Sequence, residues 1–163
     1  AAISDPGAVV VYLADPDGGA DAIDVASADA NITGIPLGII QEPIGVVPGV
    51  VTYNTLPAVN LPIPVAGTCR IKAAPGVTAA VVKQAIVDAL AVYFSTFPIG
   101  GLDQVVGAGF MYSNDLECVV RDAYPGIYAP NVTTPAGSSV AYALGEVGVL
   151  DSVVADWTVT VVA

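Results

Sequence analysis

Four aspartates near the start of the chain are the closest approach to a chemical site in this sequence. Asp15, Asp17, Asp21 and Asp24 follow one another within a short stretch. Hard cations such as Ca²⁺ take several oxygen ligands from a short loop, but the EF-hand pattern fails, because Ala20 stands where glycine is needed and no glutamate closes the loop. A turn followed by a negatively charged helix start explains the same residues. We therefore expect no metal here, and a cation site stays the alternative.

The rest of the sequence offers little for catalysis. It contains no histidine, which removes the commonest general base and the Ser-His-Asp and Cys-His arrangements. No phosphate-binding or nucleophile-elbow motif occurs, and Gly100-Gly101-Leu102-Asp103 is interpreted as a plain turn. A pair of carboxylates for glycoside hydrolysis is not excluded by sequence, yet sugar clefts usually carry aromatic platforms and the chain has 1 Trp. We predict a protein that is not an enzyme, with no catalytic residue, no cofactor and no small-molecule substrate.

The composition points to assembly. Hydrophobic residues make up 55% of the chain and charged residues 12%, about half of the roughly 25% found in ordinary soluble domains. Much of the surface must then consist of small and apolar side chains. Such a surface is tolerated mainly where other subunits cover it.

The charge balance limits the classes of partner that the chain can be expected to bind. The 4 basic residues, Arg70, Lys72, Lys83 and Arg121, stand against 15 carboxylates, giving a net charge of -11. Nucleic acids and anionic lipids are both bound through clustered Lys and Arg, so neither is an expected partner. We also expect no membrane span, because the longest apolar stretch, 38–67, is interrupted by several prolines.

Two further features concern the context of the chain. Cys69 and Cys118 match no metal or redox spacing, and we expect two buried free thiols, with a disulfide as the alternative. The chain starts with neither a methionine nor a signal-peptide pattern. We therefore expect a piece or a processed form of a longer protein.

The first half of the chain is predicted to consist mainly of extended segments. A Val-rich run, Ala8–Ala14, predicts a buried strand that ends at the turn sequence Asp15–Gly19. A short helix is predicted over Asp21–Thr33. Two extended segments, Val46–Asn54 and Ala58–Lys72, follow, and in the second Arg70 and Lys72 share one face while Cys69 and Ile71 share the other.

The second half contains the clearest helix. Ala79–Thr96 is predicted to be helical, with Thr78 as N-cap and Pro98 as the stop. Its core face is predicted to consist of Val82, Ile86, Ala89, Tyr93 and Phe97, with Lys83 and Asp88 outside it. A short extended piece (Phe110–Tyr112) precedes a second helix, capped by Ser113 or Asn114 with Glu117 completing a capping box, and apolar along Leu116, Val119, Val120 and Ala123. Strands are predicted over Ile127–Val132, Glu146–Leu150 and Trp157–Val162.

These elements define a fold class. We predict an α+β domain with a mixed or antiparallel sheet and two to three helices. The prediction is one domain over 1–163, with a possible sub-division into 1–74 and 75–163.

Several short features, in this order, resemble the C-terminal half of the baseplate J family of phage tails and related contractile injection systems. They combine turn residues with apolar runs, and they are Asp5–Val11, Glu42–Val46, Ala58–Val65, Val87–Phe94, Pro98–Gly101, Tyr112–Leu116, Ala123–Ile127 and Gly145–Leu150. The likeness spans nearly the whole chain. Two departures stand out: the family often has arginine where Glu42 stands, and its N-terminal half has no counterpart here.

The resemblance implies a structural role. It implies a subunit of the baseplate wedge that joins neighbouring wedges into a ring around the tail hub, with other baseplate subunits and copies of itself as partners. It implies a location in the virion tail or injection apparatus, assembled in the bacterial cytoplasm, and it carries over no catalytic residue. A non-catalytic extracellular binding module, of the adhesin or carbohydrate-binding type, is the alternative reading, and a hydrolase working through carboxylates is a third.

Overall fold

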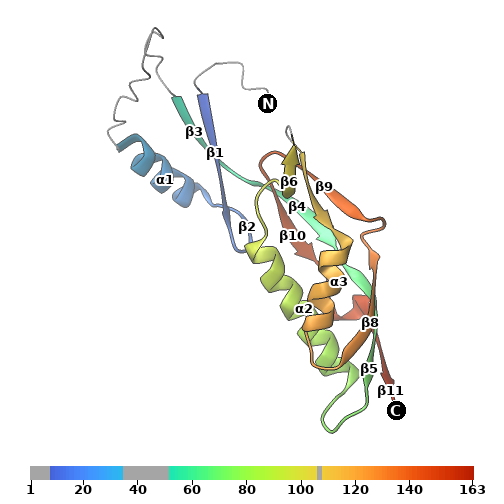
Figure 1. Ribbon diagram of the computed structural model, residues 1–163. Helices are drawn as coiled ribbons and strands as arrows, with labels where there is room; N and C mark the ends of the chain where they lie inside the picture. Colours follow the sequence, from blue (N-terminus) through green and yellow to red (C-terminus); the bar gives the residue numbers. More distant parts are fainter. Residues whose placement is uncertain (1–7, 35–51, 106–107) are drawn as a thin grey trace.

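The computed structural model describes residues 8–34, 52–105 and 108–163. In this part of the chain, three α-helices and one short 3-10 helix accompany four small sheets of parallel and antiparallel strands, which confirms the predicted α+β class (Figure 1). The elements in chain order are β1 (Ala8–Asp15), β2 (Gly18–Gly19), α1 (Ala22–Gly34), β3 (Thr52–Pro57), β4 (Val59–Pro64), β5 (Ala66–Lys72), α2 (Ala79–Thr96), β6 (Leu102–Val105), β7 (Ala108–Tyr112), α3 (Ser113–Asp122), β8 (Ile127–Thr134), β9 (Ser139–Ala143), β10 (Glu146–Asp151), η1 (Val154–Asp156) and β11 (Trp157–Val162).

The first elements, β1, β2, α1 and β3, form what we call the N-terminal arm (Figure 1). The Val-rich strand β1 pairs in parallel with β3, from Ala8 opposite Thr52 to Leu13 opposite Pro57. At its end a turn leads into β2, which pairs back on β1. The predicted strand, turn and short helix are therefore confirmed, but the strand is half-buried over residues 10–14, not buried as predicted, because it lies in the arm and none of these residues belongs to the core cluster. The predicted extended segment from Val46 is confirmed from Thr52 onward, and its first part lies outside the described residues.

The remaining elements form what we call the body, in which strands distant in sequence pair with one another. β4 pairs in parallel with β10, and β5 lies between β11, to which it is parallel, and β8, to which it is antiparallel. Along β5, Cys69 and Ile71 are buried while Arg70 and Lys72 are exposed, as the alternation predicts. Strands from 1–74 and from 75–163 therefore contribute to the same sheets.

Helix α2 begins and ends as predicted, and the Thr78 side chain accepts a hydrogen bond from the backbone N–H of Val81 at 3.3 Å. The predicted core face was rotated slightly from the observed one. Val82, Ile86 and Phe97 are buried as predicted, but Leu90 and Phe94 complete the buried stripe, whereas Ala89 and Tyr93 are half-buried. The reason is that α2 is apolar nearly all round, so periodicity alone leaves its orientation open by one residue.

Helix α3 has its predicted apolar face, with Leu116 and Val120 fully buried, but its predicted caps are wrong. Tyr112 occupies the N-cap position without a side-chain bond. The Ser113 hydroxyl instead donates to the Gly137 carbonyl at 2.7 Å, and a Glu117 carboxylate oxygen accepts from the Val132 backbone N–H at 3.3 Å. Both side chains therefore tie α3 to the β8–β9 region.

Three further expectations are corrected or extended. Cys118 is exposed, not buried, because it lies on the side of α3 away from Leu116 and Val120, while Cys69 is buried and both thiols are free. Strands β6 and β9 were not predicted; they flank β7 in an antiparallel sheet. The extended segment 58–72 is divided into β4 and β5, with Val65 between them.

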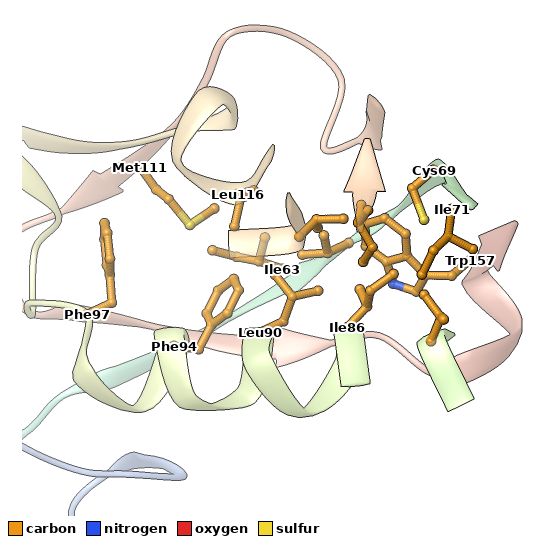
Figure 2. Close-up of a cluster of buried hydrophobic side chains, with 14 of the residues drawn as sticks. Ile63, Cys69, Ile71, Ile86, Leu90, Phe94, Phe97, Met111, Leu116 and Trp157 are labelled. Carbon is orange, nitrogen blue, oxygen red and sulfur yellow. The ribbon is translucent and has the colours of Figure 1, made fainter. Parts of the chain in front are cut away.

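The core lies in the body, between α2, α3 and the sheets (Figure 2). Trp157, at the start of β11, is the largest fully buried side chain, and it packs near Ile71 and Ile86 (Figure 2). At the other end of α2, Phe97 lies 5.6 Å from Tyr142 and 5.3 Å from Tyr93, measured between ring centroids. Aromatic rings thus pack against one another at this end of the core.

Candidate interaction surface

The four aspartates of the candidate cation site are all exposed and have separate roles. Asp15 ends β1, Asp17 lies in the turn, and Asp24 lies in the first turn of α1. Asp21 is the helix cap: its Oδ1 accepts hydrogen bonds from the backbone N–H groups of Ile23 at 2.8 Å and Asp24 at 2.9 Å. The structure thus matches the turn-and-helix-start interpretation of this stretch.

No group of three His, Cys, Asp or Glu side chains within the described ranges is placed to hold a metal ion. A hollow of about 360 Å³ opens between the β1–β2 turn and the end of α2, and Asp15 is its one carboxylate. Two hydroxyls in its wall, those of Ser95 and Thr96, donate to the Val92 backbone carbonyl at 2.8 and 3.2 Å. Among the described residues that line the hollow, no second carboxylate stands beside Asp15 to share acid-base chemistry with it.

Burial disfavours the ionised forms of two buried side chains, Cys69 and Tyr93. Burial raises the pKa of the Cys69 thiol, which disfavours the nucleophilic thiolate. Burial, and to a lesser extent the charge of Asp115, raises the pKa of Tyr93 to about 12. The Tyr93 hydroxyl and the indole Nε1 of Trp157 are buried without a hydrogen-bond partner among the described residues. These groups are part of the core and do not converge on a site.

The unpartnered Tyr93 hydroxyl gives a prediction about alkaline stability. A phenol whose pKa is raised on folding contributes stability that is present below its unfolded value, about 10, and is lost as pH rises through its folded value, about 12. Tyr93→Phe should leave stability at pH 7 unchanged or raise it by up to about 1 kcal/mol, because no hydrogen bond is lost. Between pH 10 and 12 it should lose less stability than the wild type.

Melting temperatures at pH 8 and pH 11.5 measure this effect. The exposed Tyr128→Phe is the matched control and should behave like the wild type at both values. Equal alkaline losses in Tyr93→Phe and wild type would show that Tyr93 does not titrate as its burial implies.

The surface, in contrast, exposes large apolar side chains, as the composition predicts. Large apolar side chains protrude from the arm, from both helical and strand elements of the body, and from the turns. Those more than half exposed are Ile23 at 76%, Val92 at 65%, Val59 at 62%, Val153 at 60% and Leu144 at 54%. Scattered single exposures are ordinary, but here they occur on a surface with few charges. This surface is our candidate for interaction.

The edge of β11 is part of that surface. β11 is the outermost strand of the order β11-β5-β8, and its residues, Trp157–Val162, include no charge and no proline. Soluble proteins usually protect such edges with lysine, proline, bulges or a covering segment. An unprotected edge is a template on which another strand can add.

Helix α2 is the one described element that is long and apolar enough to cross a membrane by length and composition. The prediction of no membrane span rested on the longer apolar stretch at 38–67 and did not consider this helix. Core helices of soluble proteins have the same length and composition, and α2 buries Val82, Ile86, Leu90 and Phe94 in the body.

Sequence reasoning therefore located the candidate chemical residues and missed the surface ones. Asp15, Asp17, Asp21 and Asp24 lie near one another in the arm, as their spacing implies. The exposed set was missed because Val92 and Leu144 look like core residues in the sequence. The signal available was composition, which requires some apolar residues to be exposed without identifying them. No family model matches the chain, and no curated protein matches it.

Proposed function

We propose that this protein is a structural assembly subunit, and specifically a wedge or ring component of a phage-type tail baseplate. The exposed apolar surface supports an assembly role, and the resemblance of its short motifs to the baseplate J family supports the particular assembly. In this role the chain joins neighbouring wedges around a central hub. Its partners are other baseplate subunits and copies of itself.

The exposed apolar side chains carry the proposal. Each buried Å² of apolar area contributes about 25 cal/mol, and a lone copy forgoes that contribution at Ile23, Val59, Val92, Leu144 and Val153. These residues lie on different elements, so one small contact would not cover them. We therefore expect each copy to contact at least two neighbours, burying well above the roughly 1,200–2,000 Å² of one standard interface.

A double variant tests the proposal. Val92→Glu with Leu144→Glu places two charges on exposed positions, so the melting temperature of the isolated chain should stay close to that of the wild type. Incorporation into the native particle should fall at least tenfold, because the new carboxylates would have to be desolvated at the contact. Ala91→Glu is the matched control: it adds a charge to an exposed position on α2 without removing a large apolar group.

Particles are quantified by quantitative blotting of purified assemblies and imaged by electron microscopy. Normal incorporation of the double variant, or an image in which the wild-type chain makes a single small charge-rich contact, would refute the assembly role. A calcium-dependent rise in melting temperature, abolished by EDTA, would favour a binding module instead.

A further inference from the structure

The three-stranded sheet β11-β5-β8 is covered on one face only. Helix α2 packs on β11 and α3 packs on β8, and both helices lie on the same side of the sheet (Figure 1). The opposite side, which we call the outer face, consists of exposed side chains from all three strands: Thr68, Arg70, Lys72, Tyr128, Asn131, Thr158 and Thr160.

The strand directions of this sheet allow a face that no helix covers. β11 and β5 run parallel, from Trp157 opposite Gly67 to Val162 opposite Lys72. β5 is also antiparallel to β8, so the sheet is mixed, and a sheet with antiparallel strands can expose one face to water. The outer face is therefore open to a partner.

The charge of the outer face indicates the chemistry of that partner. Arg70 and Lys72 are two of the 4 basic residues in the chain, and both are exposed on β5. Arg121, in the last turn of α3, lies at the same end of the body, because β8 begins with Ile127 opposite Ile71. We call Arg70, Lys72 and Arg121 the basic end. It is complementary to an acidic partner.

An acidic surface of this kind lies elsewhere on the same chain. Asp15, Asp17, Asp21 and Asp24, which we call the acidic corner, are exposed, and Ile23, which lies between Asp21 and Asp24 in the sequence, is 76% exposed. Protein interfaces commonly combine an apolar centre with a polar rim. The basic end has the matching arrangement, since Tyr128 lies beside Arg70 in register and is also exposed.

The two surfaces lie too far apart to neutralise each other within one copy. The acidic corner is at the C-terminal end of α2, where Asp15 lines the same hollow as Phe97, and the basic end is near its N-terminal end (Figure 1). The 18 residues of α2 span about 27 Å at 1.5 Å per residue. This is about three times the screening length of about 8 Å at physiological salt.

We propose that the acidic corner of one copy docks on the outer face of β11-β5-β8 in the next copy. Ile23 packs against Tyr128, and the aspartates face Arg70 and Lys72. This inference rests on the proposed assembly function and deepens it by naming the self-contact. Because the two surfaces differ, the contact is head-to-tail, and it produces a ring where the rotation between copies closes and a filament where it does not.

Two charge-reversal variants test the contact. The first carries Arg70→Glu and Lys72→Glu, and the second carries Asp15→Lys and Asp17→Lys, which leaves the Asp21 cap intact. Each should self-associate at least tenfold more weakly than the wild type in sedimentation velocity, because like charges then meet. An equimolar mixture should recover association, because the reversed ends complement each other. Asp88→Lys with Asp151→Lys, two exposed sites outside both surfaces, is the control matched in charge to the second variant.

Wild-type association should also weaken several-fold when salt is raised from 50 to 500 mM, which tests the contact without any mutation. Wild-type self-association in both variants, or a mixture that stays dissociated although both variants melt like the wild type, would overturn the inference. A wild-type chain that stays monomeric at every concentration but still incorporates into particles would also overturn it, while leaving the assembly function standing.

Discussion

Replacing Ile86 by aspartate should unfold the body. Ile86 is fully buried in the middle of α2 and packs in the same cluster as Trp157 and Leu90 (Figure 2). Truncation of a buried isoleucine alone costs about 2–5 kcal/mol, and the carboxylate would have no partner in an apolar environment. The sum approaches the total stability of a typical domain, about 5–15 kcal/mol. We expect a loss of at least about 4 kcal/mol, or no cooperative transition.

Val81→Asp is the control for this prediction. Val81 lies one turn into the same helix and is 47% exposed. An aspartate there would lie near the positive end of the helix dipole, so its effect should stay within about 1 kcal/mol. Thermal and urea unfolding followed by circular dichroism measure both variants. Wild-type melting of Ile86→Asp would mean that α2 does not bury this face.

The second large effect is expected at Trp157. Its side chain is fully buried, and a side chain at the neighbouring Gly67 would meet both the Asn131 carbonyl and the Trp157 ring. Trp157→Ala should cost about 3–5 kcal/mol, because the cavity left behind is too enclosed to collapse. The cost should appear as a lower urea midpoint at an unchanged slope.

Trp157→Phe separates packing from hydrogen bonding. The indole Nε1 has no partner among the described residues, so its removal should forfeit no hydrogen bond. Only the difference in volume then counts, and the cost should be less than half of that of Trp157→Ala. Equal costs for the two variants would show that the indole N–H is bonded in solution.

The sequence predicted those elements whose pattern contrasts with their surroundings. α2 is bounded by Thr78 and Pro98, which cap and stop it, and β11 is β-branched at every position after Trp157. The strands β6 and β9 were not predicted, because they are short and neither contains a run of β-branched or aromatic residues. The pairing of the strands could not be predicted either, because nothing in the sequence of β4 selects β10 as its neighbour.

The sequence predicted that an apolar interaction surface exists, but it did not predict which residues form that surface. A chain with 55% hydrophobic residues must expose some of them. Which ones depends on orientation: on α2, Leu90 is buried and Val92 is 65% exposed, although both fit an apolar helix. The same excess of apolar residues shifted the predicted core face to Ala89 and Tyr93. Uniform hydrophobicity removes the contrast on which periodicity depends.

The parallel pairing of β4 with β10 and of β5 with β11 has a consequence for synthesis. The Ser152 hydroxyl donates to the Val65 carbonyl at 2.6 Å across 87 positions of sequence, and the neighbouring strand pairs span similar separations. At about 5–20 residues per second, the ribosome needs about 4–17 seconds to deliver the partners of β4 and β5. During that interval the nascent strands present open backbone edges to other emerging chains. Slow translation would therefore lower the soluble yield of this protein, and a chaperone that shields β4 and β5 would raise it.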